Sequence, residues 1–343
     1  MTYYGSIALQ YDFMKKVLII QTASIGDVIL VTPVLEALHQ NRPDARIDLL
    51  VKNGMEQLFN RHPFVHNVLV WQKAKGKYKS LHRLIHQVRS EKYDVVINVQ
   101  RFMSSGLITV LSGAGTTIGF GKNPLSKLFT HRVEHKIGDP SVHEVDRNCA
   151  LLKPLGIDPT PIIKLYPAQQ DYGAIQAYQV KAYICLAPAS LWFTKQFPRE
   201  KWVELLDNLP HHYRCYLLGS QADTDFLKRI SNKTMHPDVI SLAGQLTLLQ
   251  TAALMSAAVM NYCNDSAPLH LASAVNAPVT AIFCSTIPAF GFGPRSDKSW
   301  IAETEENLAC RPCGIHGLKS CPEGHFRCGT SININQLIIN LPK

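Results

Sequence analysis

Four short polar segments contain the residues that could do chemistry, and each joins an apolar run to a stretch with helical spacing. The first, residues 22–27 (TASIGD), ends at Asp27. This carboxylate could act as a general base, or it could interact favourably with the dipole of the helix that it starts. Gly26 is the single glycine of the segment, so the G-x-G-x-x-G pattern of dinucleotide-binding proteins is missing, and the chain has no P-loop motif.

The second segment, residues 264–270 (NDSAPLH), follows an apolar run and precedes a helical one. Either Asp265 or Ser266 could cap that helix. The same geometry would direct backbone amides near Ser266 and Ala267 toward a diphosphate. His270, one turn further on, would then reach the ligand, although a single helical histidine is more often structural. Capping and anion binding both remain open from the residues alone.

The third and fourth segments also join a strand-like run to a helical one. Residues 187–198 carry one cation, Lys195, which is either a solvated lysine or the ammonium that neutralises a phosphate leaving group. Residues 219–225 (GSQADTD) carry acids that could bind a ribose or cap a helix.

Nine cysteines occur in the chain, and four of them gather near its end with the spacing C-x2-C-x7-C-x6-C: Cys310, Cys313, Cys321 and Cys328. This density permits a structural zinc site. The spacing is irregular beside that of a zinc ribbon, however. It favours reduced thiols that pack a loop or shape a binding site.

The elements that must position these segments alternate in type. Strand-like runs are predicted at 17–20, 47–51, 95–99, 183–186, 216–218, 239–242, 259–262 and 279–283. Helical windows are predicted at 28–38, 78–90, 200–209, 223–230, 248–257 and 269–274. Alternation of this kind is typical of parallel sheets covered by helices. A proline-rich stretch near the middle of the chain divides the series into two domains.

Composition fits a soluble globular protein, with 343 residues, 46% hydrophobic and 18% charged. Lysine and arginine outnumber aspartate and glutamate by 35 to 26, a net charge of +9 that favours polyanionic partners. A basic stretch runs through Lys73, Lys75, Lys77, Lys79, His82, Arg83 and Arg89, and it is either a solvated helix face or a surface for anionic lipid or a phosphorylated acceptor. With no secretory pattern at its start, the protein is expected to be cytoplasmic.

Four of these regions, taken together, resemble the bacterial lipopolysaccharide heptosyltransferases of glycosyltransferase family 9. They are KKVLIIQTASIGDVILVTPVLEAL, TKQFPREKW, NDSAPLHLASA and the tail ending in CPEGHFRC, in the order of the family and over residues 14–330. The resemblance implies an α/β fold of the GT-B type, with two Rossmann-like, doubly wound parallel-sheet domains that face each other across a cleft. We expect an N-terminal extension (1–13), an acceptor-side domain (14–160), a linker (161–180), a nucleotide-sugar domain (181–330) and a C-terminal helix (331–343).

The resemblance also implies roles for individual residues. Asp27 matches the catalytic base that deprotonates the acceptor, and Lys195 matches the lysine that binds the donor phosphate. Asp265, Ser266 and His270 match the D-[ST]-G-x-x-H sugar and phosphate motif, with Ala267 in place of glycine. The other implied donor contacts are Ser190, Asp225 and Leu246.

The function implied is inverting transfer of a heptose from ADP-heptose to a lipopolysaccharide core acceptor of the lipid A–Kdo type. No cofactor or divalent metal is expected, because an ammonium and helix amides can stabilise the departing diphosphate. The expected partners are the nucleotide sugar and a phosphorylated lipid-linked saccharide, with peripheral contact to anionic membrane at its inner face and no nucleic acid. Two alternatives remain: a family 9 enzyme that uses another nucleotide sugar, and a non-catalytic anion- or zinc-binding protein on a degenerate transferase scaffold.

Overall fold

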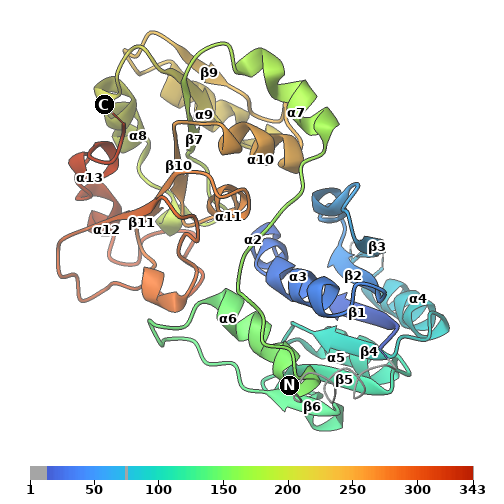
Figure 1. Ribbon diagram of the computed structural model, residues 1–343. Coiled ribbons are helices and arrows are strands. Elements are labelled where there is room, and N and C mark those ends of the chain that lie inside the picture. The colour runs from blue at the N-terminus through green and yellow to red at the C-terminus, as the bar shows by residue number, and fades with distance from the viewer. Residues whose placement is uncertain (1–13, 74–75, 343) are drawn as a thin grey trace, which may run out of the picture. The chain divides into compact units, whose positions relative to one another are not determined.

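The computed structural model describes residues 14–73 and 76–342 (Figure 1). The predicted extension 1–13 and Lys75 therefore lie outside the described residues. The described chain forms two compact units. Unit 1 runs to Ile137 and also includes Glu144–Tyr166, and unit 2 contains Gly138–His143 and the residues from Pro167 on.

The described part of unit 1 is built around a six-stranded sheet in which all neighbouring strands are parallel. Its strands, in the order β3-β2-β1-β4-β5-β6, are Val65–Trp71, Arg46–Lys52, Lys16–Ile20, Val95–Asn98, Thr116–Phe120 and His131–Val133. The helices are α2 (Ile25–Ile29), α3 (Thr32–Asn41), α4 (Lys77–Ser90), α5 (Met103–Leu111) and α6 (Glu144–Cys149). Short 3-10 turns lie at Glu56–Phe59, Ser126–Leu128 and Ala150–Leu155.

Unit 2 contains a second sheet of six described strands, again parallel throughout. In the order β12-β11-β10-β7-β8-β9, its strands are Ser299–Glu303, Val279–Phe283, Met260–Asn264, Tyr183–Ala187, Arg214–Leu217 and Val239–Ser241. The helices are α7 (Gln169–Ile175), α8 (Arg199–Asn208), α9 (Thr224–Ser231), α10 (Leu248–Ser256), α11 (Ala267–Ala274), α12 (Arg327–Thr330) and α13 (Asn335–Ile338). Short 3-10 turns include Phe193–Lys195 and Gln221–Asp223.

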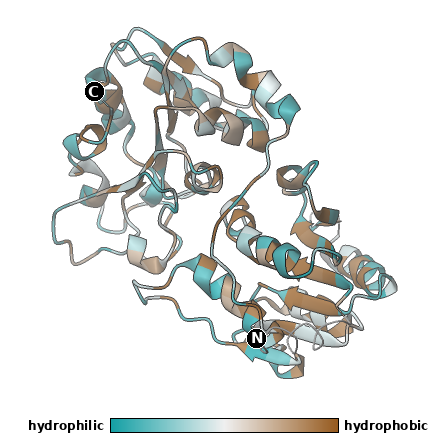
Figure 2. Cartoon of the chain, in the orientation of Figure 1, coloured by the Kyte–Doolittle hydropathy of each residue, from teal (hydrophilic) through white to brown (hydrophobic). Residues whose placement is uncertain are grey.

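The central strands are buried along their whole length, as the burial of β7 and β10 shows. Helices cover parallel sheets on both faces, so central strands read as continuous apolar runs. Figure 2 shows these hydrophobic strands inside each unit and hydrophilic helix surfaces outside. In unit 1 the amphipathic helix α4 buries Leu84 and Val88 against β3. Burying one such side chain stabilises the fold by about 2 kcal/mol.

One predicted helix, over residues 28–38, is wrong as a single element, because the structure divides it into α2 and α3. Pro33 lies in the first turn of α3. Proline lacks the amide that would continue a preceding helix, and it suits a first turn. The chain therefore ends one helix and starts another at this point.

Four strands were missed by the sequence analysis: β3, β5, β6 and β12. They contain polar residues such as His66, Thr116 and Arg132, and their apolar runs are short. Pairing with a neighbouring strand stabilises them more than their own pattern does. Within the segments predicted as linker and C-terminal helix, the structure forms α7 and α13.

Both sheets have the same topology. Numbered along the chain within each unit, the strands of both sheets lie in the order third, second, first, fourth, fifth, sixth. The strand order reverses between the first and fourth strands, which are β1 and β4 in one unit and β7 and β10 in the other. Ligands of such sheets bind outside the carboxyl ends of the strands at this point. Within the described ranges, no helix combines the length and the apolar character needed to cross a bilayer.

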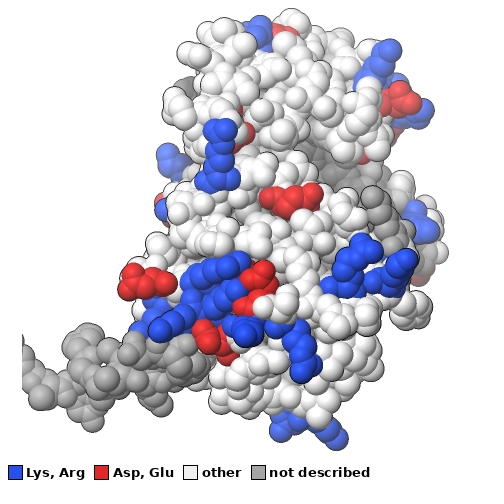
Figure 3. Space-filling model, turned by 90° about the vertical axis from the view of Figure 1, so that its right-hand side faces the viewer, with Lys and Arg blue, Asp and Glu red and all other residues white. Residues whose placement is uncertain are grey.

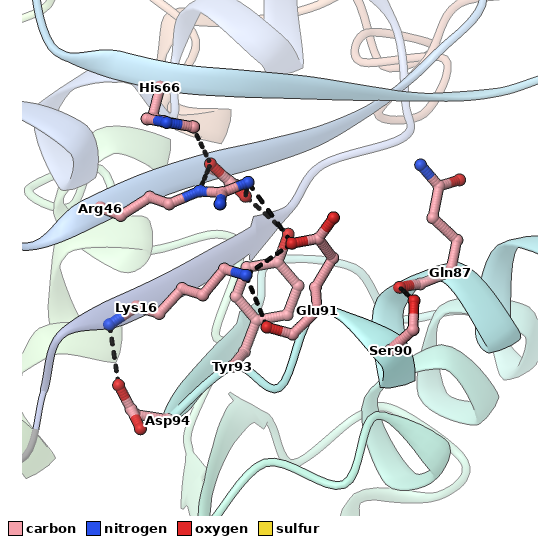
Figure 4. Close-up of polar contacts among 9 residues, drawn as sticks. Lys16, Arg46, His66, Gln87, Ser90, Glu91, Tyr93 and Asp94 are labelled. Atoms are coloured by element: carbon pink, nitrogen blue, oxygen red, sulfur yellow. Dashed lines mark hydrogen bonds and ion pairs between the residues drawn. The ribbon is translucent and has the colours of Figure 1, made fainter.

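A charged network joins the amino ends of the strands of unit 1 (Figure 4). The fully buried carboxylate of Asp48 accepts two hydrogen bonds from Arg46, at 3.1 and 3.0 Å, and one from the hydroxyl of Tyr93 at 2.7 Å. Nearby, Lys16 Nζ pairs with Glu91 at 2.5 Å, and this ammonium lowers the pKa of the Glu91 carboxyl. A buried carboxylate with this many donors is compensated for its loss of water.

We expect Asp48→Ala to lower the free energy of unfolding by about 3 kcal/mol, because it leaves Arg46 and the Tyr93 hydroxyl without their buried partner. Urea unfolding followed by circular dichroism measures this change. The exposed Asp44 provides a matched control, and Asp44→Ala should change stability little. Equal effects of the two substitutions would contradict a structural role of the network.

Candidate active site

Asp27 is the third residue of α2, directly after the carboxyl end of β1. Its Oδ2 accepts hydrogen bonds from the backbone N of Ser24 at 3.0 Å and from Ser24 Oγ at 2.5 Å. The helix-start interpretation of Asp27 is therefore confirmed. Both bonds use Oδ2, and the side chain is half-buried, so Oδ1 remains outside this cap. The bonds to one oxygen fix the orientation of the carboxylate, and the other oxygen takes no part in them.

The loop that carries Lys195 is tied to β10 by the fully buried side chain of Asn264. Asn264 Nδ2 donates to the carbonyl of Pro188 at 2.7 Å, and Asn264 Oδ1 accepts from the amide of Phe197 at 3.0 Å. One amide side chain thus holds both ends of the loop. Ser190 is half-buried in the same loop, whereas the neighbouring Leu191 is 90% exposed.

Lys195 and Asp265 form an ion pair of 2.7 Å, with side chains only 15% and 6% exposed. Asp265 Oδ2 also accepts a hydrogen bond from Thr286 Oγ1 at 2.7 Å. Lys195 is therefore not the solvated surface lysine that the sequence left open. The carboxylate of Asp265 binds this ammonium and hydroxyl.

Ser266 is the N-cap residue of α11, but its side chain makes no capping hydrogen bond among the described residues. The Ser266 hydroxyl lies 3.4 Å from the carbonyl of Asn264 instead. The capping explanation of Ser266 is therefore wrong for its side chain. Pro268 lies in the first turn and has no amide to satisfy. The backbone amides at the start of a helix suit an anion, as does the positive end of its dipole.

His270 is buried on α11, and burial lowers the pKa of its imidazole from the ordinary value of 6.5 to about 3. The charges of His143 and Lys195 lower this pKa further. His270 Nδ1 has no hydrogen-bond partner among the described residues. A neutral imidazole with an unused nitrogen thus lies near the ion pair of Lys195. Buried polar atoms are almost always paired, so this nitrogen is suited to a ligand.

Asp225 and Leu246 belong to two other loops of unit 2. Asp225 is exposed in the first turn of α9, and Leu246 is half-buried just before α10. The amide of Gly244 donates to the carbonyl of Gly219 at 2.9 Å, which brings the two loops together. Of the two acids at 223 and 225, Asp223 accepts hydrogen bonds from Ser220 N and Oγ at 2.8 and 2.6 Å, and these bonds cap the 3-10 turn Gln221–Asp223 that precedes α9. Within the part of the chain that the structure describes, no contact places Asp225 or Leu246 at the ion pair, and their donor roles stay predictions.

One residue of the site was missed by sequence reasoning, Thr286, which donates to Asp265. Thr286 lies three residues beyond β11, and its only signal would have been a polar side chain after a buried strand. Asn264 belongs to the segment 264–270, but no role was predicted for its side chain. Its signal was stronger, since an asparagine at the end of an apolar strand must find buried partners.

All nine cysteines are free thiols. Burial, together with the neighbouring thiols of the cluster, raises the pKa of Cys328 to about 11, so this thiol stays protonated at neutral pH. Cys310 Sγ lies 3.8 Å from His325 Nε2. Among the residues that the structure describes, however, no group of three or more His, Cys, Asp or Glu side chains is arranged to hold a metal ion.

Comparison with known proteins identifies the chain. A family model described as glycosyltransferase family 9 (heptosyltransferase) matches residues 81–314, which is more than half of the chain. The chain belongs to glycosyltransferase family 9. This family 9 glycosyltransferase is 28% identical to lipopolysaccharide heptosyltransferase 3 of Escherichia coli over 76% of its own length and 81% of that protein.

Two solved structures show that this family 9 glycosyltransferase has the fold that the sequence predicted. E. coli ADP-heptose LPS heptosyltransferase II superposes with a TM-score of 0.76 at 22% identity, covering 95% of this chain and 97% of that one. The E. coli heptosyltransferase WaaC, solved with ADP-2-deoxy-2-fluoro heptose, gives a TM-score of 0.70 at 22% identity and covers 87% and 96%. Two Rossmann-like parallel sheets of the GT-B type are thereby confirmed. The alternative of a non-catalytic protein is set aside, because family membership makes the chain a glycosyltransferase.

The depressed pKa of His270 predicts how the stability of the enzyme depends on pH. Below the ordinary value of 6.5 the unfolded chain binds a proton that the folded chain takes up only near pH 3, so stability falls on acidification. Between about pH 7 and about pH 5, His270 should account for about 2 kcal/mol of the fall in the free energy of unfolding, and His270→Gln should remove this part.

Urea unfolding of wild type and variant at the two pH values measures this loss. His212, which is exposed in the same unit, serves as control, because an exposed imidazole is solvated in both states. If His270→Gln keeps the full pH dependence of the wild type, the imidazole is not held neutral in the folded protein.

Proposed function

We propose that this glycosyltransferase transfers a heptose from ADP-heptose to a lipopolysaccharide core acceptor, with inversion at the anomeric carbon. The names of its relatives support this substrate class, and so does the ADP-heptose analogue with which WaaC was solved. Within the chain itself, the observation that carries the proposal is the buried Lys195–Asp265 ion pair beside the first turn of α11. It combines a cation, a carboxylate and helix amides, which is what a nucleoside diphosphate sugar needs.

The donor binds to unit 2 in this proposal. The Lys195 ammonium and the amides of Ser266 and Ala267 stabilise the negative charge that develops on the diphosphate as it departs. Asp265 keeps the ammonium in place and offers its second oxygen to a sugar hydroxyl. His270, neutral at physiological pH, supplies Nδ1 for a further hydrogen bond. This charge stabilisation comes from fixed protein groups, and it needs no divalent cation.

The acceptor binds to unit 1. Asp27 removes the proton of the acceptor hydroxyl through Oδ1, since Oδ2 is held by Ser24. The acceptor oxygen forms a bond to the anomeric carbon as the bond from that carbon to the phosphate oxygen breaks. The electron pair of the broken bond leaves with ADP, and the proton stays on Asp27. Attack from the face opposite the leaving group inverts the configuration at the anomeric carbon.

Asp27→Asn and Lys195→Ala should affect different steps. Asparagine keeps an oxygen for the Ser24 bonds but cannot take a proton, so Asp27→Asn should lower kcat by about 1,000-fold or more and leave the Kd for ADP within about twofold. Lys195→Ala should weaken ADP binding by on the order of 10- to 100-fold. Calorimetric titration with ADP and turnover with ADP-heptose measure the two effects.

If Asp27→Asn, which keeps the Ser24 bonds, leaves kcat unchanged, Asp27 acts only as a helix cap and its proposed role as the base fails. Unchanged ADP affinity in Lys195→Ala would exclude the phosphate role of that residue. Thermal stabilisation by a panel of UDP-, GDP- and CMP-sugars completes the test. If one of these stabilises the protein more than ADP-heptose does, the transferase class stands and the heptose donor is wrong.

Unit 1 also has a basic surface suited to a phosphorylated, lipid-linked acceptor. The exposed side of α4 carries Lys79, His82, Arg83, His86 and Arg89. Figure 3 shows Lys and Arg side chains gathered on one face of this unit. In addition, Lys73 Nζ lies 3.3 Å from the carbonyl of Thr22, in the loop that leads to Asp27. We therefore include in the proposal a peripheral contact with the anionic inner face of the cytoplasmic membrane.

Charge reversal on α4 tests this contact. Lys79→Glu combined with Arg83→Glu should reduce binding to vesicles that contain anionic phospholipid by on the order of tenfold or more, since each basic residue near such a surface contributes about 1 kcal/mol. Co-sedimentation measures binding. As control, Lys228→Glu combined with Arg229→Glu makes the same charge change at exposed positions of α9 on unit 2. This variant should bind the vesicles almost as well as the wild type. Binding that is independent of anionic lipid would exclude the membrane contact.

A further inference from the structure

The loop of Lys195 is fastened at the neighbouring residue, Thr194, which is buried. The Thr194 hydroxyl accepts hydrogen bonds from the amide of Leu318 at 2.8 Å and from Ser285 Oγ at 2.9 Å. The Thr194 amide donates to the carbonyl of Leu318, and its carbonyl accepts from the amide of Ser285, both at 3.1 Å. Every polar group of Thr194 is thus used to join the lysine loop to two other segments.

The segment that contains Leu318 is itself anchored to the end of β11. Arg311 donates to the carbonyls of Cys284, Phe283 and Thr286, and it pairs with Glu303 at 2.6 Å. The amide of Cys313 donates to the carbonyl of Ser285 at 3.1 Å. Residues 311–318, the first part of the cysteine-rich region, therefore contact both the lysine loop and the strand end that carries Thr286, the second partner of Asp265.

Gly317 lies directly against the side chain of Lys195. Its φ of +75° is in the left-handed region, and a Cβ built there would lie 2.8 Å from Lys195 Cγ and 3.1 Å from Lys195 Cδ. The same atom would lie 3.1 Å from the Cβ of Trp192. Real side chains do not approach so closely, so a methyl group here must displace the lysine stem. Gly317 is the residue whose lack of a side chain lets Lys195 reach Asp265.

We propose that residues 311–318 are a positioning element for the donor-binding lysine, in which Thr194 fixes the loop and Gly317 fixes the path of the Lys195 side chain. The proposal rests on the phosphate-binding role proposed for Lys195. It gives the cysteine-rich region a function that needs no metal. The segment contacts the aliphatic part of Lys195 and so determines where the ammonium lies. Charge-assisted hydrogen bonds depend strongly on geometry, so a displaced stem weakens the contact of the ammonium with an anion.

Gly317→Ala tests the proposal, and Gly314→Ala is its matched control. Gly314 also has a positive φ, +122°, in the same segment, but a Cβ there would meet nothing within 4 Å. Both substitutions strain the backbone, and only one touches Lys195. Gly317→Ala should raise the Kd for ADP on the order of tenfold and leave the Kd for adenosine, which has no phosphate, within about twofold. Gly314→Ala should change neither.

A double-mutant cycle shows whether Gly317 acts through Lys195. In a Lys195→Ala background, Gly317→Ala should weaken ADP binding no further. A further loss of equal size would overturn the positioning role. If Lys195→Ala weakens ADP binding and Gly317→Ala does not, the positioning role fails and the proposed function stands. If Lys195→Ala has no effect on ADP binding, the proposed phosphate role is what fails.

A measurement without ligand keeps the proposal testable in every case. Acetic anhydride labels exposed, unpaired amines, and mass spectrometry reads each lysine separately. Lys195, which is only 15% exposed and ion-paired, should label slowly in the wild type and in Gly314→Ala, and several-fold faster in Gly317→Ala. The exposed Lys319 should label equally in all three proteins. Equal labelling of Lys195 in all three would overturn the proposal.

If Gly317→Ala fails to fold, Thr194→Val replaces it. Valine has nearly the shape of threonine but cannot accept the bonds from Leu318 and Ser285, so Lys195 should label faster. Thr194→Ser keeps the hydroxyl and should restore slow labelling. Slow labelling of Lys195 in Thr194→Val would contradict the role of the Thr194 hydroxyl in fixing the loop.

Discussion

Pairing of the first strand with the fourth is the constraint on which the site of each unit depends. In unit 2, Cys263 of β10 lies opposite Ala187 of β7, so the loops after these strands start side by side. Asn264 then uses its buried amide to hold both ends of the lysine loop. Loops that leave neighbouring parallel strands would otherwise diverge toward different helices. The ion pair of Lys195 and Asp265 exists because this register and this amide bring two distant segments together.

Several residues of the site hold the fold together and also have a role in the proposed mechanism. Asp27 starts a helix with one oxygen, and the proposed mechanism assigns the other to the acceptor proton. Asp265 pairs with an ammonium that would be costly to bury alone. Such groups are oriented before any ligand arrives, and fixed dipoles need no reorganisation during reaction. In this family 9 glycosyltransferase, a helix start and a buried ion pair are therefore sufficient to fix the positions of these charged groups.

The stabilising charges and the proposed base of unit 1 lie at opposite ends of its sheet. The network around Asp48 lies at the amino ends of the strands, whereas Asp27 follows the carboxyl end of β1. Buried charges at the amino ends are fully paired within the chain. In unit 2 the buried His270 keeps a nitrogen without a partner among the described residues, near Lys195 and at the end of the sheet where ligands bind. Buried polar groups that have all their hydrogen-bond partners within the chain stabilise the fold, whereas one without a partner is suited to a ligand.

The sequence by itself determined the fold class, because buried parallel strands must be apolar along their length and their alternation with helices is visible in the order of residues. It also determined where Asp27, Lys195 and Asp265 lie, since each follows a recognisable strand. It could not determine β6 or β12, which their neighbours in the sheet stabilise. Only the tertiary structure decided that Lys195 pairs with Asp265, that Thr286 joins them and that Gly317 borders the lysine. These contacts join residues far apart in the chain, and no local pattern encodes a distance across a sheet.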